Sequence, residues 1–263
     1  MPHVEQLFLS MLLPNHNDAV VTFGKFNAPF GIERRDFWDR LTGSATLLFI
    51  ARPQDLVGAM VTYPIPDWNL TLRPMVVNGF NQNIDYNQQP SFACMTEWQP
   101  TCHLSLAVTN WFGPEFPDDN THKLFFTDAQ LSWTAIDCLT LQAEYLDVRS
   151  ESQYGPLDWR SAAAIASYHW SKQTRLFAQY SWLDDPWWFF SPVPQWIQQF
   201  SVGLSYFLHP HVEFRGEYRH DFAHRVAPGY YGAPGDYQSS NAPTYVITSG
   251  SQDSFFLNLT FGY

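Results

Sequence analysis

Near the end of the chain, charged residues alternate with uncharged ones, and these charged residues are the strongest candidates for a functional site. Every second residue from 213 to 221 is charged: Glu213, Arg215, Glu217, Arg219 and Asp221. Side chains two apart share one face of a strand. Such a ladder either lines a water-filled channel and sets its ion preference, or forms an internal ion-pair network that fills a narrow barrel. Val212, Phe214 and Tyr218 occupy the opposite face.

Other charged residues are candidates for the same surface. Four of them fall on the polar faces of other expected strands: Arg73, Asp128, Glu144 and Arg175. Charge on a lipid-facing surface costs about 2–4 kcal/mol for Arg or Lys at the bilayer midplane, so we expect these groups to face the lumen. A further cluster opens the long loop over 27–54: Glu33, Arg34, Arg35 and Asp36. We interpret it either as part of a pore constriction or as an ordinary exposed loop.

Residues for metal binding or covalent catalysis form no recognisable set. His209 and His211 flank a turn proline, and the other histidines nearby lie a strand length away, so the spacing predicts no metal site. No motif places a serine nucleophile beside a histidine base. A phosphate-binding loop is not indicated either, because no helical pattern follows Gly24-Lys25. We therefore expect no enzyme, no cofactor and no metal. The aromatic loop over 184–195 predicts a belt at the membrane interface, with stacking on a sugar or partner as the alternative.

Period-two patterns predict about thirteen strands that could position these residues. Their ranges are 3–12, 19–26, 56–63, 69–80, 91–98, 102–111, 122–135, 138–149, 158–170, 175–183, 196–208, 211–222 and 254–263. Short turns alternate with long loops, of which 27–54 and 223–253 are the longest. This alternation is typical of outer-membrane barrels. We predict one all-β domain over 1–263, an antiparallel transmembrane β-barrel, with 27–54 extracellular or folded into the lumen and 223–253 extracellular.

Composition agrees with a strand-based membrane protein. The 263 residues are 45% hydrophobic and 17% aromatic, yet no apolar run is long enough for a spanning helix. The formal net charge of -11 disfavours nucleic acid as a partner. It would give a water-filled lumen a weak preference for cations. Of the three cysteines, Cys94 and Cys102 are placed symmetrically about Trp98, so a cross-strand disulfide is conceivable.

The two ends of the sequence carry separate expectations. Alternate residues of the last segment are large and apolar, ending in Phe261 and Tyr263, which predicts a closing strand with one lipid-facing side. The terminal aromatic resembles the signal read by the barrel-assembly machinery. The start lacks a signal peptide, and thirteen is an odd number whereas bacterial single-chain barrels have an even one. We therefore expect an N-terminal truncation and 14–16 strands in the intact protein.

Residues 20–36, VVTFGKFNAPFGIERRD, resemble a signature of the OmpL-like putative β-barrel porins, G-K-[FY]-x-[TA]-P-[FIL]-G-x-E. The matching residues are Gly24, Lys25, Phe26, Ala28, Pro29, Phe30, Gly31 and Glu33. A second segment, Val77 to Asn87, resembles that family's later motif, and the resemblance extends over essentially the whole chain. Gly24 and Gly31 would permit backbone conformations closed to other residues, and Pro29 would stiffen the turn.

The resemblance implies a porin of the bacterial outer membrane that lets small hydrophilic solutes or ions diffuse passively. Its partners would be outer-membrane lipid, those solutes and the assembly machinery, with a homo-oligomer as a further possibility. Two alternatives stay open: a non-conducting barrel with a structural, adhesive or receptor role, and, more remotely, a barrel enzyme.

Overall fold

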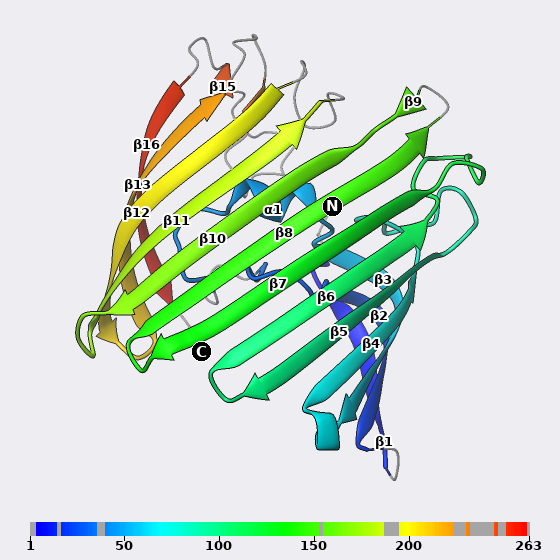
Figure 1. The fold of residues 1–263 in the computed structure, drawn as a ribbon, viewed down its shortest axis with the longest axis horizontal. Coiled ribbons are helices and arrows are strands. Elements are labelled where there is room, and N and C mark those ends of the chain that lie inside the picture. The colour runs from blue at the N-terminus through cyan, green and yellow to red at the C-terminus, as the bar shows by residue number, and fades with distance from the viewer. Residues whose placement is uncertain are drawn as a thin grey trace. The chain divides into compact units, whose positions relative to one another are not determined.

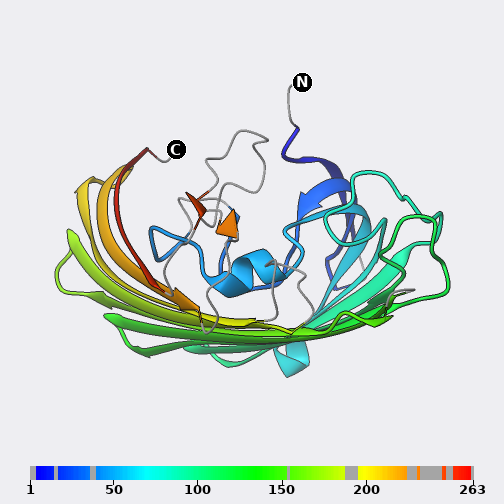
Figure 2. The same ribbon diagram turned by 90° about the horizontal axis from the view of Figure 1, so that it is seen from above.

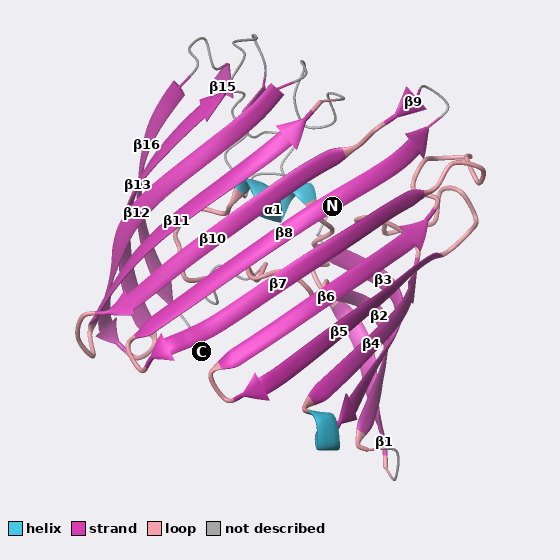
Figure 3. Cartoon of the chain, viewed as in Figure 1, coloured by secondary structure: helices cyan, strands magenta, loops and turns pink. Residues whose placement is uncertain are grey.

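The computed structural model describes residues 4–14, 17–35, 40–152, 155–186, 195–223, 230–231, 245–246 and 251–261. Strands make up most of it, as Figure 3 shows. They are β1 (Leu7–Leu13), β2 (Ala19–Asn27), β3 (Asp55–Ile65), β4 (Leu70–Val77), β5 (Ser91–Thr101), β6 (Leu104–Gly113), β7 (Leu124–Ile136), β8 (Leu139–Ser152), β9 (Gly155–Pro156), β10 (Trp159–His169), β11 (Thr174–Asp185), β12 (Gln195–His209), β13 (Val212–Ala223), β14 (Tyr230–Tyr231), β15 (Tyr245–Val246) and β16 (Ser251–Phe261). A short helix, α1 (Leu47–Ala51), and a 3-10 turn, η2 (Pro66–Trp68), complete the described elements.

The thirteen long strands form one path in which each strand neighbours the next along the chain (Figure 1). The order is β1-β2-β3-β4-β5-β6-β7-β8-β10-β11-β12-β13-β16, and β9 pairs with β8 to make a 14-stranded sheet. Neighbouring strands such as β12 and β13, and β13 and β16, pair antiparallel, with Gly203 opposite Glu217 and Glu217 opposite Phe256. The predicted all-β antiparallel fold and its thirteen principal strands are confirmed.

Connections alternate in length as predicted. Tight turns join β5 to β6 and β12 to β13, whereas 27 residues separate β2 from β3 in sequence, from Ala28 to Gln54. The strands themselves run a few residues longer at many ends than the sequence pattern indicated. Within 28–54, which the sequence presented as irregular, residues 47–51 form α1. Among the described residues, no helix has the length and hydropathy needed to cross a bilayer.

The disulfide that the sequence made conceivable between Cys94 and Cys102 does not form. All three cysteines are free. The β5–β6 hairpin turns at residues 102 and 103, since Thr101 lies opposite Leu104. The register shifts between Trp98 and Thr101, and Cys94 lies opposite Asn110. The placement of the two cysteines symmetrically about Trp98 was therefore misleading, and their sulfurs are not cross-strand neighbours.

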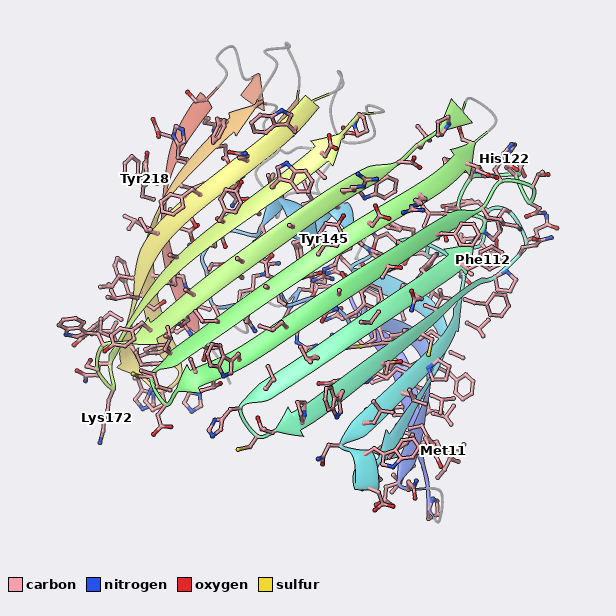
Figure 4. The ribbon with its side chains drawn as sticks, in the orientation of Figure 1. Met11, Phe112, His122, Tyr145, Lys172 and Tyr218 are labelled. Atoms are coloured by element: carbon pink, nitrogen blue, oxygen red, sulfur yellow. The ribbon has the colours of Figure 1, made fainter. Side chains whose placement is uncertain are left out.

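The chain folds as two compact units, residues 1–31, 52–131 and 146–157 in the first, and 32–51, 132–145 and 158–263 in the second. Over much of each unit one face of the sheet is covered and the other exposed, and we call them the covered face and the outer face. Strand β1 differs, since its residues on both faces are exposed except Leu13. In the second unit α1 lies on the covered face of β10 and β11, visible in Figure 2. Tyr145, Phe112 and Tyr218 project from their strands in Figure 4, and Phe112 and Tyr145 are exposed.

The last strand, β16, follows the predicted alternation. Its outer-face residues Phe255, Leu257, Leu259 and Phe261 are all exposed, with Phe255 at 79% relative exposure. The residues between them are half-buried. Tyr263 lies outside the described residues, as does most of the loop 223–253 and of the aromatic loop 184–195.

Candidate functional site

The charged ladder of β13 lies on the covered face of the second unit. Its five residues, Glu213, Arg215, Glu217, Arg219 and Asp221, are all at most 4% exposed. Phe214 and Phe222, on the other face of the same strand, are exposed. Full burial of five charges requires a partner for each, because an unpaired buried charge costs several kcal/mol.

Most of those partners come from the ladder itself and from β11, which lies one strand beyond β12 in the sheet. Both Glu213 oxygens accept from Arg215, at 3.0 and 2.8 Å, and Arg175 Nη2 donates to Glu213 Oε1 at 3.0 Å. Arg219 Nε donates to both Asp221 oxygens, at 2.9 and 2.7 Å. The predicted lining residue Arg175 thus joins the ladder in space.

Glu217 is bonded differently, to a segment that lies far away in sequence. We call residues 40–46 the strap. The backbone N–H groups of Gly43 and Ser44 donate to Glu217 Oε2 at 2.6 and 2.8 Å, and the Ser44 hydroxyl donates to Oε1. Bonds to a charged acceptor are worth about 1.5–3 kcal/mol each, so this one side chain holds the strap firmly to β13.

Carbonyl groups of the strap are also bonded to the sheet. Arg215, at 0% exposure, donates to the carbonyls of Thr42 and Arg40. Gln199 Nε2 donates to the Ala45 carbonyl at 3.0 Å. Since backbone donors and acceptors of the strap are both used, the strap lies against β12 and β13 in a fixed conformation.

Both ends of the segment that contains the strap are anchored within the second unit. Ile32 N donates to Glu144 Oε2 at 2.8 Å, and Trp159 Nε1 donates to the Ala51 carbonyl at 3.0 Å. Glu33 is 4% exposed and accepts from the backbone N–H and the hydroxyl of Thr46. Thr46 Oγ1 in turn accepts from Phe49 N, which caps α1.

The four charges expected at the start of the loop therefore separate. Glu33 is a buried structural group, Arg34 is exposed and Arg35 is half-buried. Asp36 lies outside the described residues. Arg40, which sequence analysis passed over, binds the Arg34 and Arg35 carbonyls at 2.7 and 2.9 Å, and its guanidinium stacks on Phe49.

Two predicted lining residues belong to the first unit. Arg73 on β4 forms an ion pair with Glu97 on β5 at 2.8 Å, and both side chains are 20% exposed. Asp128 on β7 is fully buried and accepts from Gln130. A lining role for these two residues stays a prediction.

The motif over 24–33 anchors the start of the long segment in the first unit. Phe30 is 1% exposed and packs on Phe126, which stacks on Trp111 with ring centroids 5.3 Å apart. Gly31 has φ +96°, and a Cβ there would lie 2.0 Å from the Arg52 guanidinium carbon. Gly24 has φ +125°, so the expected need for glycine at both positions is confirmed.

The remaining motif residues are structural too. Lys25 pairs with Asp55 at 3.8 Å, and Phe26 is buried. Ala28 N donates to the Gln54 carbonyl at 2.8 Å, next to Pro29, which brings the two ends of the 28–54 connection together. The motif thus closes the base of this connection.

A half-buried carboxylate also fastens the loops that follow β4 and β6. Glu115 accepts from Phe80 N at 2.6 Å, Ser91 Oγ at 2.7 Å and Trp111 Nε1 at 2.8 Å. Sequence analysis missed this residue, as it missed Ser44, Gln179 and Gln199. For Gln179 and Gln199 a signal was available, since Gln179 and Ser181 in β11, and Gln199 and Ser201 in β12, follow the two-residue period of the ladder.

Glu115 gives the first testable prediction. Burial raises its pKa, partly opposed by hydrogen bonds from Ser91, Phe80 and Trp111. The folded loops therefore bind this proton more tightly than the unfolded chain, and the stability that this provides is full below the ordinary pKa of 4.5 and is lost as the pH rises through the raised pKa. We expect exchange of the Phe80 amide hydrogen, corrected for its intrinsic rate, to accelerate over that pH window. Glu115→Gln should remove the pH dependence; its persistence in the variant would contradict the assignment.

Metal chemistry receives no support from the geometry. In the part of the chain that the structure describes, no group of three or more His, Cys, Asp or Glu side chains is placed to hold a metal ion. His209 and His211 stack on one another at the β12–β13 turn. His224 lies outside the described residues.

A covered face rich in buried ions, an exposed apolar outer face and an antiparallel sheet with alternating connections together define a porin-type outer-membrane β-barrel. The chain belongs to the family described as "Putative beta-barrel porin-2, OmpL-like", whose sequence model matches residues 1–262. The resemblance inferred from residues 20–36 is confirmed. No protein among curated sequences matches this chain closely enough to count as a relative.

Solved structures share the fold at low sequence identity. The anion-selective porin from Comamonas acidovorans superposes with a TM-score of 0.68 at 12% identity, over 94% of this chain and 75% of that one. Outer-membrane OmpT of Vibrio cholerae gives 0.62 at 11% identity, over 92% and 76%. The outer membrane channel DcaP of Acinetobacter baumannii gives 0.55 at 11% identity, over 77% and 65%. At these identities the likeness establishes the fold.

Proposed function

We propose that this chain is a porin of the bacterial outer membrane through which small hydrophilic solutes or ions diffuse passively, without turnover or cofactor. One observation carries the proposal: β13 buries five alternating charges on one face and exposes Phe214 and Phe222 on the other. An apolar outer face suits lipid, and an ionic covered face suits water and ions. The strap, bound to Glu217 and Arg215, is the constricting element in this proposal.

A second function is favoured by a specific feature. The ladder charges are bonded to one another or to the strap, as in a plugged, non-conducting barrel with a structural or receptor role. Planar bilayer recording separates the two. A porin gives ohmic single-channel steps, whereas a folded protein that shows no current would contradict the proposal of passive diffusion.

Ion selectivity provides a prediction for the ladder. Removing three carboxylates with Glu213→Gln, Glu217→Gln and Asp221→Asn leaves Arg175, Arg215 and Arg219 without their acidic partners. We expect the permeability ratio, measured as a reversal potential in a salt gradient, to shift severalfold toward anions.

The matched control removes the same number of carboxylates from exposed positions outside the strands, Asp67, Asp118 and Asp137. It should leave the reversal potential close to that of the wild type. Equal shifts in both triple variants would show that only total charge matters and would remove the ladder from the pore.

The outer face supports further parts of the proposal. Exposed Phe255, Leu257 and Phe261 would contact outer-membrane lipid. Phe261, together with Tyr263, would present the C-terminal signal to the barrel-assembly machinery. One OmpT structure from Vibrio cholerae is described as a trimer form, and we propose a homo-oligomer here on that likeness, to be measured by native mass spectrometry.

A further inference from the structure

The contact between Glu217 and the strap has the form of a carboxylate receptor. Two consecutive backbone N–H groups, of Gly43 and Ser44, point at one carboxylate oxygen, and the Ser44 hydroxyl points at the other. Successive N–H groups that converge in this way make anion-binding concavities in proteins. The group bound here is the chain's own Glu217.

The site is built by residues other than its occupant. Gln179 and Gln199 both direct an Nε2–H group at Ser44 Oγ, at 3.2 and 3.4 Å, which leaves the hydroxyl proton of Ser44 for the carboxylate. Arg215 fixes the carbonyl of Thr42 before the two N–H groups, and Gln199 fixes the carbonyl of Ala45 after them. The donors therefore keep their directions without help from Glu217.

The size of the site also fits a carboxylate closely. A Cβ at Gly43 would lie 2.5 Å from Glu217 Oε2, so any larger residue at 43 would occupy the space of the bound oxygen. Ser44 is 4% exposed and Arg215 is 0% exposed, which excludes water from the donors and strengthens their bonds. The ionic surroundings include Arg215 and Arg219, each also engaged by an acidic residue of the ladder.

We propose that Gly43 and Ser44 form a carboxylate-binding site, that Glu217 is its resident ligand, and that a small free carboxylate occupies the site when that side chain is removed. Carboxylate-bearing solutes are then the class that the strap recognises. Binding to the site does not depend on the proposed function; only the recognition of solutes in transit rests on it.

The test is chemical rescue of Glu217→Ala with sodium acetate, measured as the midpoint of thermal unfolding in detergent at neutral pH. Sodium chloride at equal ionic strength is the comparison. We expect the variant to melt below the wild type and acetate to raise its midpoint saturably, with no such rise in chloride. The wild type and Glu217→Gln should show no acetate-specific rise, because their side chains still fill the site.

A second variant and a second measurement keep the test decisive. Glu217→Ala with Ser44→Ala lacks one donor and should lose most of the acetate effect. If Glu217→Ala does not fold in chloride, the refolding yield in acetate becomes the readout, and rescue is expected. An acetate effect no greater than that of chloride, or one equal in the Ser44→Ala double variant, overturns the proposal. Neither readout uses conductance. The absence of current in a bilayer would therefore not affect the rescue result, and a failed rescue would not contradict the proposal of passive diffusion.

Discussion

Glu217→Gln is expected to loosen the strap and to change single-channel current from steady steps to larger, fluctuating ones. An amide offers one acceptor oxygen where the carboxylate offers two, and its NH₂ group faces a donor. The loss of one charge-assisted bond costs about 2 kcal/mol, which raises the population of the detached strap roughly thirtyfold. Hydrogen exchange at the Gly43 and Ser44 amides gives an independent measurement of the same event.

The control is Glu97→Gln, which also removes one carboxylate paired with an arginine. Glu97 bonds with Arg73, Gln99 and Ser105, which all lie in the first unit. It should leave exchange at Gly43 and Ser44 unchanged. If Glu217→Gln leaves that exchange unchanged as well, Glu217 does not hold the strap.

Gly31→Ala is expected to lower the urea midpoint of unfolding strongly. The backbone there has φ +96°, which costs an L-residue about 1–2 kcal/mol. The new methyl group would also meet the Arg52 guanidinium at 2.0 Å, and overpacking of this kind adds about 1–3 kcal/mol.

Gly155→Ala separates the two causes. Gly155 has φ +115° but nothing within 4 Å of its Cβ position, so its substitution carries the backbone strain alone. The difference between the two variants measures the clash with Arg52. Equal midpoints would mean that Arg52 moves aside freely and that the close packing at Gly31 contributes nothing to stability.

The family motif illustrates how far local sequence can lead. Its glycines indicated special backbone conformations, and both have positive φ. Its acidic residue Glu33 was interpreted either as part of a pore constriction or as part of an exposed loop. In the structure it is buried and binds Thr46, thirteen residues later. A charged residue in a loop has the same appearance in sequence whether it meets water or a buried backbone donor, because the donor belongs to another part of the chain.

The conceivable disulfide failed for a related reason. The predicted strands 91–98 and 102–111 place the turn at 99–101, but β5 continues to Thr101 and the turn falls at residues 102 and 103. Alternation defines which face a residue occupies, and it leaves the cross-strand partner open until the turn is located.

The sequence by itself determined the strands, their faces, the alternation of connections and the charged ladder of β13, because the two-residue period of a strand is a local pattern of neighbouring residues. Only the tertiary structure decided what the ladder binds. Glu217 and the Gly43–Ser44 pair are 174 and 173 residues apart, and no periodicity relates them. A buried charge such as Glu217 requires a partner. Which partner it has follows only from the path of the strap across β12 and β13.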